Sequence, residues 1–545
     1  MSFDQQILEA SKKHPRPARI FAYGTAGFRM KADLLPSVVF RVGLLAAARS
    51  RKMNGQSIGV MITASHNPPE DNGVKLVDPY GDMLEATWEP HATAFANAKT
   101  DEELVEEFNK LHTSLKINSS APARVIYARD TRASGPTLVD CLVDALTATN
   151  TEYTDYKLLT TPQLHYLVRC TNTKGTQYEY GDVSETGYYE KLSTAFKQAM
   201  KNAKSKGTIT VDCANGVGGP KLRELVKYLP SQAEGGVDIK VVNEDVHKPD
   251  NLNSQCGADF VKTQQRAPPS SKAAPGDRCA SLDGDADRIV YYFIDEDSNF
   301  RLLDGDRIAT LAAAFLGELG EKSGLASKLS IGVVQTAYAN GASTKFITEN
   351  LKLPIQCTPT GVKYLHHAAQ RFDIGVYFEA NGHGTVLFSP LALKTIATHE
   401  PQSPSQADAL ATLTAATELI NQTVGDALSD LLLVEVILAH KAWDPANWLS
   451  TYTDYPNRLV RVEVGNRNVF KTEDAERRLT EPKHAQARID ELVGKYTKGR
   501  SFARASGTED AVRVYAEAAT RAEADDLAQK VAGIVKQFGG LALSK

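Results

Sequence analysis

Short apolar runs that end in polar turns recur along most of the chain. Three clear cases are Ile58–Ile62 before Thr63–Asn67, Ile209–Asp212 before Cys213–Gly216, and Ile374–Phe378 before Glu379–Gly382. Longer segments with helical spacing follow these turns, and strands alternating with helices predict α/β units with largely parallel sheets. Such sheets bind ligands beyond the carboxyl ends of their strands, where these polar turns lie. The turns are therefore the first places to search for a site.

The last hundred residues follow a different pattern. Arg458–Val464 alternates polar and apolar residues, which is typical of a strand with one face in water. This part predicts a smaller α+β domain. With 545 residues the chain is too long for one hydrophobic core, so about three to five domains are expected. The polar stretch Thr171–Ser184 places the end of the first domain near residue 185.

Composition excludes several classes of partner. The hydrophobic share of 42% and charged share of 23% are ordinary for a globular protein, and the net charge of −4 favours neither nucleic acid nor an anionic membrane. The first residues lack the apolar core of a signal peptide, and no apolar stretch has the length of a membrane span. The six cysteines are widely spaced, which fits neither zinc nor a disulfide framework. We therefore expect a reduced, cytoplasmic protein.

Three carboxylates at alternate positions mark a candidate metal site at Asp283, Asp285 and Asp287. Like charges this close repel unless a cation neutralises them, and oxygen ligands select a hard ion, Mg²⁺ or Ca²⁺. An EF-hand needs Gly at its sixth position and Glu at its twelfth, where this chain has Arg288 and Ile294. Three protein oxygens that leave room for water and phosphate favour Mg²⁺. The alternative is an acidic turn in solvent.

Ser65, followed by His66, stands after an apolar run and before Pro68-Pro69, where a rigid turn could present a nucleophile. The segment lacks the G-x-S-x-G pattern of α/β-hydrolases, so acyl chemistry is not indicated. The alternative is a Ser/Asn turn that caps the next helix.

Two further turns have the composition of ligand loops. Glu379, Asn381 and the glycines beside them can bind sugar hydroxyls, although a tight Asn-Gly turn would look the same. Arg504-Ala505-Ser506-Gly507-Thr508, with Arg513 beyond it, offers donors for a dianionic phosphate; a polar turn before a strand is the alternative. No Walker loop is present, and the glycines at 216–219 miss the G-x-G-x-x-G spacing, so neither NTP nor NAD binding is indicated.

The four motifs in this order resemble the α-D-phosphohexomutase superfamily over nearly the whole chain. The residues that carry the resemblance are Thr63–Pro68, Asp283–Arg288, Glu379–His383 and Arg504–Glu509. It implies four domains around a central cleft: three α/β mixed-sheet domains in series and the smaller C-terminal α+β domain. We place the domains at residues 1–185, 186–298, 299–445 and 446–545.

Within the superfamily the chain looks most like the eukaryotic phosphoacetylglucosamine mutases. Ala286 stands where other branches usually carry Gly, and the sugar loop reads Glu-Ala-Asn-Gly-His rather than Gly-Glu-x-Ser-Gly. The resemblance implies interconversion of N-acetylglucosamine 6-phosphate and 1-phosphate, on the route to UDP-N-acetylglucosamine. The cofactors implied are Mg²⁺ and a hexosamine 1,6-bisphosphate that acts as primer and intermediate.

The resemblance also assigns roles to residues. The catalytic residues expected are Ser65 as phosphoserine, His66, Arg29 and Lys75, with Lys75 either a general base or a charge partner. The metal ligands expected are Asp283, Asp285, Asp287 and an oxygen on Ser65. The substrate residues expected are Thr360, Gly361, Glu379, Asn381, Gly382, His383, Arg504, Ser506, Gly507, Thr508 and Arg513.

Three other functions stay open at this stage. The same chemistry on glucose or mannose phosphate is one, a sugar-phosphate sensor without activity is the second, and a phosphatase is the third. Small-molecule sugar phosphates are the expected partners, without nucleic acid or membrane. We expect a monomer or a weak dimer.

Overall fold

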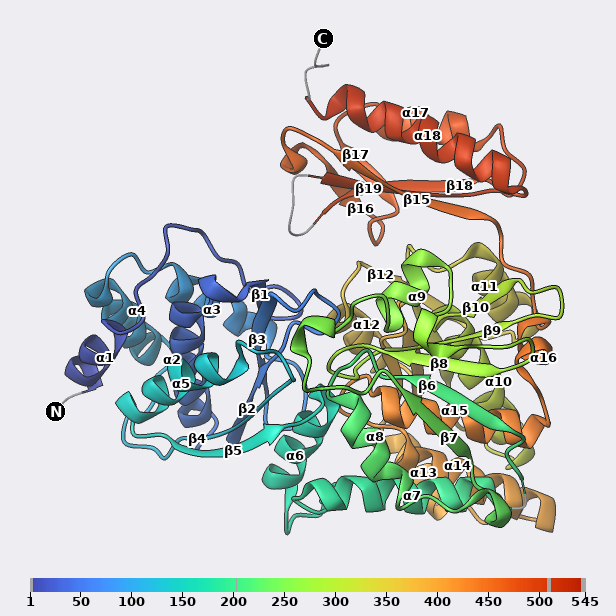
Figure 1. Ribbon diagram of the computed structural model, residues 1–545, viewed down its shortest axis with the longest axis horizontal. Coiled ribbons are helices and arrows are strands. Elements are labelled where there is room, and N and C mark those ends of the chain that lie inside the picture. Colours follow the sequence, from blue (N-terminus) through green and yellow to red (C-terminus); the bar gives the residue numbers. More distant parts are fainter. Residues whose placement is uncertain (1–2, 202, 507–510, 541–545) are drawn as a thin grey trace. The chain divides into compact units, whose positions relative to one another are not determined.

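The computed structural model describes residues 3–201, 203–506 and 511–540 (Figure 1). The chain divides into two compact units. The first comprises Met1–Asp304 with Thr414–Pro445, and the second comprises Gly305–Leu413 with Ala446–Lys545. Within the described residues, no helix combines the length and apolar character needed to cross a membrane.

The first unit begins with a five-stranded sheet of order β1-β3-β2-β4-β5, in which β2, β4 and β5 are parallel and β3 runs antiparallel to both of its neighbours, β1 and β2. Its elements are α1 Phe3–Ser11, β1 Phe28–Lys31, α2 Pro36–Lys52, β2 Ser57–Ile62, β3 Asp71–Val77, α3 Glu89–Asn97, α4 Asp101–Ser114, β4 Arg124–Arg129, α5 Gly135–Ala148, β5 Glu152–Leu158 and α6 Thr161–Thr173. Helix α2 is buried along nearly its whole length and packs against α5 and β2. Its buried Arg49 is paired with Asp78 at 2.7 Å, since a buried charge needs a partner.

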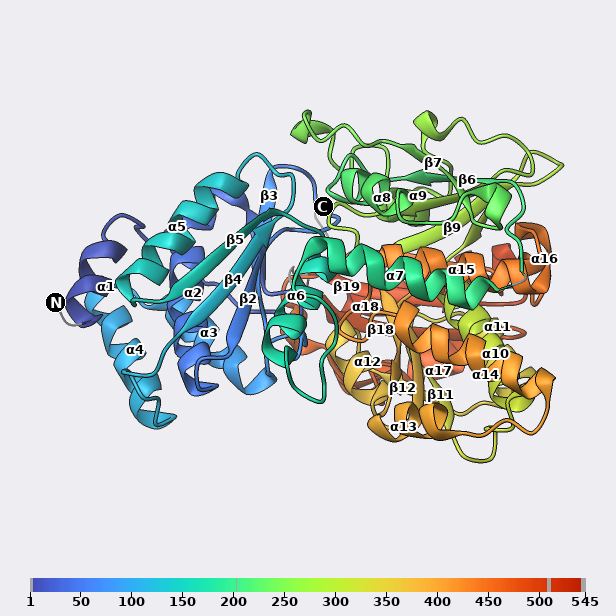
Figure 2. The same cartoon turned by 90° about the horizontal axis from the view of Figure 1, so that it is seen from below.

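A second five-stranded sheet, of order β10-β9-β8-β6-β7, completes the first unit. Its elements are α7 Glu185–Met200, β6 Thr208–Asp212, α8 Gly218–Val226, β7 Asp238–Val242, α9 Ala258–Gln264, β8 Arg278–Leu282, β9 Ile289–Ile294, β10 Phe300–Leu303 and, from later in the chain, α15 Ala427–Lys441. Helices α7 and α15 lie side by side (Figure 2). Asp426 caps α15 and accepts a hydrogen bond from Tyr188 Oη of α7 at 2.8 Å, which fixes the start of α15 in place.

The second unit holds a four-stranded sheet of order β12-β11-β13-β14, with only β14 antiparallel. Its elements are α10 Gly305–Lys322, β11 Ile331–Thr336, α11 Gly341–Lys345, β12 Ile355–Thr358, α12 Val362–Ala369, β13 Ile374–Phe378, β14 Gly384–Phe388 and α13 Pro390–Thr398. Helix α14 Pro404–Leu419 follows these elements and leads back into the first unit.

The C-terminal part is an antiparallel sheet of order β15-β19-β18 with a separate hairpin, β16-β17. Its elements are α16 Pro445–Leu449, β15 Asn457–Glu463, β16 Lys471–Glu473, β17 Arg478–Glu481, α17 Ala485–Val493, β18 Arg500–Ala505, β19 Ala511–Glu517 and α18 Arg521–Phe538. Helices α17 and α18 cover one face of the sheet (Figure 1), and Val462, Val512 and Val514 point into the core beneath them. The predicted small α+β domain is confirmed.

The three larger sheets share one departure from the simplest α/β pattern. The turns that carry Ser65, the three aspartates and Glu379 each connect an inner strand to an antiparallel neighbour: β2 to β3, β8 to β9, and β13 to β14. The polar turn at Cys213–Gly216, by contrast, leads from β6 into α8, as a strand-to-helix turn. The sheets are therefore mixed, as the fold class stated, and the candidate loops are hairpin connections rather than strand-to-helix turns. Helix α10 begins at Gly305, and glycine is required there because a side chain would meet the Glu379 carbonyl at 1.8 Å.

Candidate active site

Ser65 lies in the turn between β2 and β3 and is 1% exposed. Its backbone is left-handed, with φ of 51°, a conformation that costs a non-glycine residue about 1 kcal/mol. The turn is held from both sides: Ser65 N donates to Thr63 Oγ1 at 2.9 Å, and Ser65 O accepts from Asn253 Nδ2 at 2.9 Å and Arg132 Nη2 at 3.0 Å. Strained backbone fixed by several neighbours is typical of functional positions.

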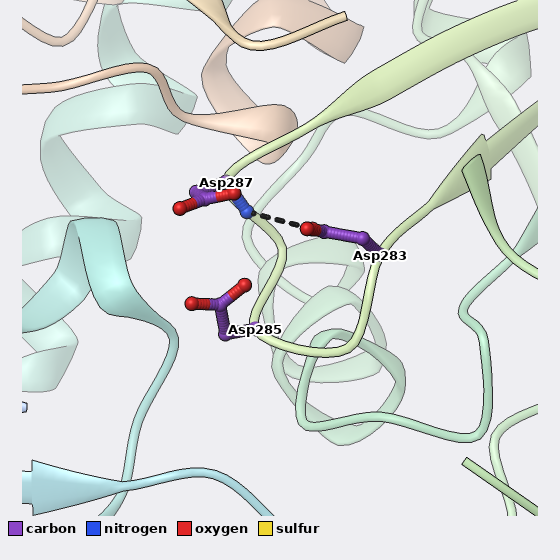
Figure 3. Close-up of side chains that lie close together, drawn as sticks. All are labelled: Asp283, Asp285 and Asp287. Atoms are coloured by element: carbon purple, nitrogen blue, oxygen red, sulfur yellow. Dashed lines mark hydrogen bonds between the residues drawn. The ribbon is translucent and has the colours of Figure 1, made fainter. Parts of the chain in front are cut away.

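The turn between β8 and β9 carries Asp283, Asp285 and Asp287, all buried (Figure 3). One carboxylate oxygen of each lies within 4.8 Å of the other two. Asp283 Oδ1 accepts hydrogen bonds from the backbone N–H groups of Asp287 at 3.1 Å and Arg288 at 3.2 Å, which closes the turn. Burial, followed by the charges of Asp287 and Asp285, raises the pKa of Asp283 well above its usual value.

Ser65 meets this aspartate turn directly. Its Oγ donates to Asp283 Oδ2 at 2.6 Å, although 218 positions separate the two residues in the chain. A side chain on Gly284 would stand 2.7 Å from Ser65 O, so glycine is required for this approach. The structure thus places a hydroxyl group at the edge of a cluster of three carboxylates.

The aspartate cluster fits a hard divalent cation. Asp285 Oδ1 is buried and has no hydrogen-bond partner within the described part of the chain, which leaves an electron-rich oxygen available to an ion. All donors are oxygens, the ligand type that Mg²⁺ takes. A bound cation would remove the repulsion that raises the pKa of Asp283. Asp283, Asp285 and Asp287 are therefore suited to hold Mg²⁺.

Basic residues surround the same point. Lys75 of β3 places Nζ 3.5 Å from both Asp285 Oδ2 and Asp287 Oδ2. Arg29 of β1 places Nη1 3.3 Å from Asn67 Oδ1 and 3.5 Å from His66 Nδ1. Burial, and then the charges of Arg288 and Arg29, lower the pKa of His66 well below its usual value, so its imidazole is neutral. This mixture of cations and carboxylates suits a phosphoryl group beside a metal.

Some supporting residues were missed by sequence reasoning. Thr161, at the start of α6, donates its Oγ1–H to Asp285 Oδ2 at 2.6 Å and its backbone N–H to Asp285 O at 3.1 Å. A side chain on Gly216 would stand 2.4 Å from Gly284 O, so the glycine loop after β6 packs against the metal turn. The capping box of Thr160 and Gln163 was a readable sign of a helix start, but only the fold brings that start to Asp285.

The predicted sugar loop is a tight turn between β13 and β14, within the second unit. Glu379 N donates to His383 O at 2.9 Å, and Gly382, with φ of 89°, donates its N–H to Glu379 O at 2.9 Å. Asn381 Oδ1 accepts from His383 N at 3.0 Å, and Asn381 Nδ2 lies 3.4 Å from Glu379 Oε2. The turn thus presents a carboxylate and an amide together, the groups that vicinal hydroxyls require.

The predicted phosphate loop joins β18 to β19. Arg504 donates from Nε to Tyr338 Oη at 3.0 Å, and Ser506 N donates to Ala511 O at 2.8 Å. Arg513 is the cross-strand partner of Arg504, so the two arginines share one face of the sheet. Gly507 and Thr508 lie outside the described residues.

Thr360 and Gly361 precede α12 and lie beside this arginine. Glu476, from the β16-β17 hairpin, accepts hydrogen bonds from Thr360 Oγ1 at 2.6 Å and from Arg504 Nη1 at 3.2 Å. Gly361, with φ of 129°, starts the helix. The structure therefore brings the residues expected to be catalytic and metal-binding together in the first unit, and it places the described residues expected to bind sugar and phosphate in the second.

Comparisons with known proteins agree with this arrangement. The family models described as "Phosphoacetylglucosamine mutase AMG1, domain II" and "domain III" match residues 174–290 and 304–443. Those described as "Phosphoglucomutase/phosphomannomutase, alpha/beta/alpha domain I" and "C-terminal domain" match residues 43–98 with 93–181, and 459–534. Four domains in series are thereby confirmed.

Relatives are similar over nearly the whole chain. A phosphoacetylglucosamine mutase of Candida albicans is 50% identical, over 98% of this chain and 100% of its own. A solved structure of N-acetylphosphoglucosamine mutase of Aspergillus fumigatus is 65% identical, with a TM-score of 0.97 and 99% of each chain covered. A second structure of the Aspergillus fumigatus enzyme, described as in complex with GlcNAc-6P and magnesium, is 64% identical, with a TM-score of 0.96, over 99% of this chain and 100% of that one. The chain therefore belongs to the phosphoacetylglucosamine mutase family, within the α-D-phosphohexomutase superfamily.

Proposed function

We propose that the chain interconverts N-acetylglucosamine 6-phosphate and N-acetylglucosamine 1-phosphate, with Ser65 as the residue that gives and regains the phosphoryl group. The observation that carries the proposal is the 2.6 Å contact between Ser65 Oγ and Asp283 Oδ2 in a buried three-carboxylate turn. The Aspergillus fumigatus relative, 64% identical, is described in complex with GlcNAc-6P and magnesium, which supports the choice of substrate and ion.

The reaction balances with two transfers and no water. The bond between phosphorus and Ser65 Oγ breaks as the free O1 hydroxyl of the 6-phosphate attacks, which produces the 1,6-bisphosphate and a free serine. The 6-phosphate of this intermediate then returns to Ser65, and the 1-phosphate is released. Arg29 and Lys75 contact the phosphoryl oxygens, and the two carboxylate contacts of Lys75 favour a charge partner over a general base.

Asp283, Asp285 and Asp287 would hold Mg²⁺, which supplies positive charge beside the transferring phosphoryl group. The buried, unpartnered Asp285 Oδ1 supports this assignment. The protein's own contribution is to keep the three carboxylates and the Ser65 hydroxyl in one fixed arrangement, which reduces reorganisation during transfer.

In the second unit we assign the sugar to Glu379, Asn381, Gly382 and His383. Glu379 and Asn381 offer an acceptor and a donor to two neighbouring hydroxyls, which exchange places when the bisphosphate turns over. Arg504, Ser506, Arg513 and the Thr360-Gly361 turn hold the phosphate that does not react. These assignments rest on residue chemistry and on motif positions.

The direct test is a ³¹P NMR assay of purified full-length protein with N-acetylglucosamine 6-phosphate, Mg²⁺ and a catalytic amount of the bisphosphate. We expect the 1-phosphate signal to grow, without release of inorganic phosphate, and Ser65→Ala to abolish turnover. Intact-mass analysis should show one phosphate increment that Ser65→Ala lacks. Steady release of inorganic phosphate would show a phosphatase instead, and equal kcat/KM for glucose 1-phosphate would remove the N-acetylglucosamine assignment.

We further propose a cytoplasmic, monomeric or weakly dimeric enzyme whose partners are small sugar phosphates, with its product used for UDP-N-acetylglucosamine synthesis. The six cysteines are free thiols, five of them buried, which suits a reducing compartment. Size measurement of the purified protein in solution, by light scattering, tests the oligomeric part.

A further inference from the structure

The β16-β17 hairpin carries a carboxylate at its tip that the proposed reaction does not use. Strands β16 and β17 are only three and four residues long. The turn between them contains three successive residues with left-handed backbone, Asp474 at φ 50°, Ala475 at φ 55° and Glu476 at φ 66°. Residues other than glycine adopt this conformation at a cost, and Arg477 closes the tip by donating its backbone N–H and its Nε to the Asp474 carbonyl, at 3.2 and 3.0 Å.

The side chain of Glu476 contacts Thr360 and Arg504, two residues of the expected phosphate site, within the second unit. Its Oε2 accepts two hydrogen bonds from Thr360, one from the backbone N–H at 2.9 Å and one from Oγ1 at 2.6 Å. Its Oε1 accepts one from Arg504 Nη1 at 3.2 Å. Both charged side chains are mostly buried, at 18% exposure for Arg504 and 19% for Glu476.

These are the donors that a phosphate would use. A backbone N–H before a helix, a threonine hydroxyl and a guanidinium together form an anion site, and a carboxylate matches such a site in the same way as two phosphate oxygens. Each N–H or O–H can point at one acceptor well, so the Glu476 carboxylate and an incoming phosphate compete. A dianion placed beside the carboxylate would also be repelled by it.

We propose that Glu476 is an internal mimic of the substrate phosphate: it occupies the anion site formed by Thr360 and Arg504, and a hexosamine phosphate must displace it to bind. This inference takes its substrate, a hexosamine phosphate, from the proposed function. The anion site itself is argued from the contacts of Thr360 and Arg504. The residue thereby determines selectivity. A sugar phosphate gains the contacts of the sugar loop and can displace Glu476, whereas inorganic phosphate has only the anion site to gain.

The other role for Glu476 would be a permanent strut that orients Arg504 toward the phosphate. The hairpin geometry allows displacement, because Arg477 closes the tip on the Asp474 carbonyl through its backbone N–H at 3.2 Å and its Nε at 3.0 Å. The Glu476 side chain can therefore leave Thr360 and Arg504 while the turn stays closed. The two roles predict opposite changes in affinity. A mimic weakens phosphate binding, and a strut strengthens it.

The test uses full-length Glu476→Gln, which keeps the size of the side chain and removes its charge, and Glu476→Ala, which also removes its acceptors. Glu473→Gln is the matched control, since Glu473 is an exposed carboxylate on the same hairpin. Calorimetric titration with inorganic phosphate should give a Kd about 10-fold lower for both Glu476 variants and an unchanged Kd for Glu473→Gln. Melting curves of each variant establish that it is folded.

Steady-state kinetics give the second measurement. The KM for N-acetylglucosamine 6-phosphate should fall in the Glu476 variants, and inhibition by inorganic phosphate should increase more than substrate binding does. Unchanged or weaker binding of both ligands would overturn the inference and show a strut or a passive surface residue. The phosphate titration needs no turnover, so it can support this inference even if the wild-type protein fails to convert the hexosamine phosphate.

Discussion

The hydrogen bond from Thr161 to Asp285 gives the sharpest test of how the metal turn is held. Thr161→Val keeps the shape of the side chain and removes only the hydroxyl that donates to Asp285 Oδ2 at 2.6 Å. Both residues are fully buried, so water cannot replace the lost donor. Among the residues that the structure describes, Lys75 Nζ, at 3.5 Å, is then the remaining partner of that oxygen.

The size of the effect follows from these contacts. A hydrogen bond to a charged group contributes about 1.5–3 kcal/mol. If that energy keeps the carboxylate turned so that Oδ1 stays available to Mg²⁺, losing it weakens the ion's binding by about 10- to 100-fold. The KM for the hexosamine phosphate and the rate at saturating Mg²⁺ should change little, because Thr161 is fully buried and its hydroxyl is bonded to Asp285.

The assay is the initial rate over a Mg²⁺ titration of protein first stripped with EDTA. Thr161→Ser, which keeps a hydroxyl, should recover most of the affinity. Thr171→Val on the same helix is the control, because the Thr171 hydroxyl donates to the Leu167 carbonyl of its own helix, at 2.8 Å. An unchanged half-saturation for Mg²⁺ in Thr161→Val, or a lost rate that excess Mg²⁺ does not restore, would refute the reasoning.

Three further predictions concern stability. Ser65→Gly and Ser65→Ala should both lose turnover. The glycine variant should be about 1 kcal/mol more stable than the alanine variant in urea unfolding, since glycine adopts the left-handed backbone without cost. Equal stabilities of the two variants would contradict the assigned strain. Asp285→Asn should raise the metal-free Tm by reducing charge repulsion and should abolish the rise that Mg²⁺ produces; a preserved Mg²⁺ response would disprove the ligand assignment. Burial, and then the charge of Asp426, raise the pKa of Asp430 well above its usual value, and neither carboxylate oxygen has a hydrogen-bond partner within the described residues. The folded state then binds more protons than the unfolded state, so the wild type loses stability as pH rises above the unfolded pKa. The Tm advantage of Asp430→Asn over the wild type should therefore be larger at about pH 8 than at about pH 5. An equal advantage at both pH values would contradict this.

The sequence alone could predict those parts of the candidate site in which one short segment supplies all of the interacting groups. Three aspartates at alternate positions predict a cation turn whatever the fold, because their repulsion is local. The same holds for Arg504 and Ser506 as donors to an anion. By contrast, the segments around Thr161 and Glu476 do not mark either residue as part of a site. Thr161 bonds to Asp285, 124 positions away, and Glu476 bonds to Thr360, 116 positions away, so their proposed roles arise only in the folded chain.

The sequence alone determined the class of fold, the order of the motifs and the residue types of each loop, since apolar periodicity, turn chemistry and charge are properties of neighbours along the chain. Only the tertiary structure decided that the loops are hairpin connections to antiparallel strands and that Ser65 Oγ lies 2.6 Å from Asp283. It also decided which glycines permit that approach. The physical reason is that strand pairing and burial join residues far apart in the chain, and their pairwise distances are set by how whole sheets and helices pack rather than by local preference.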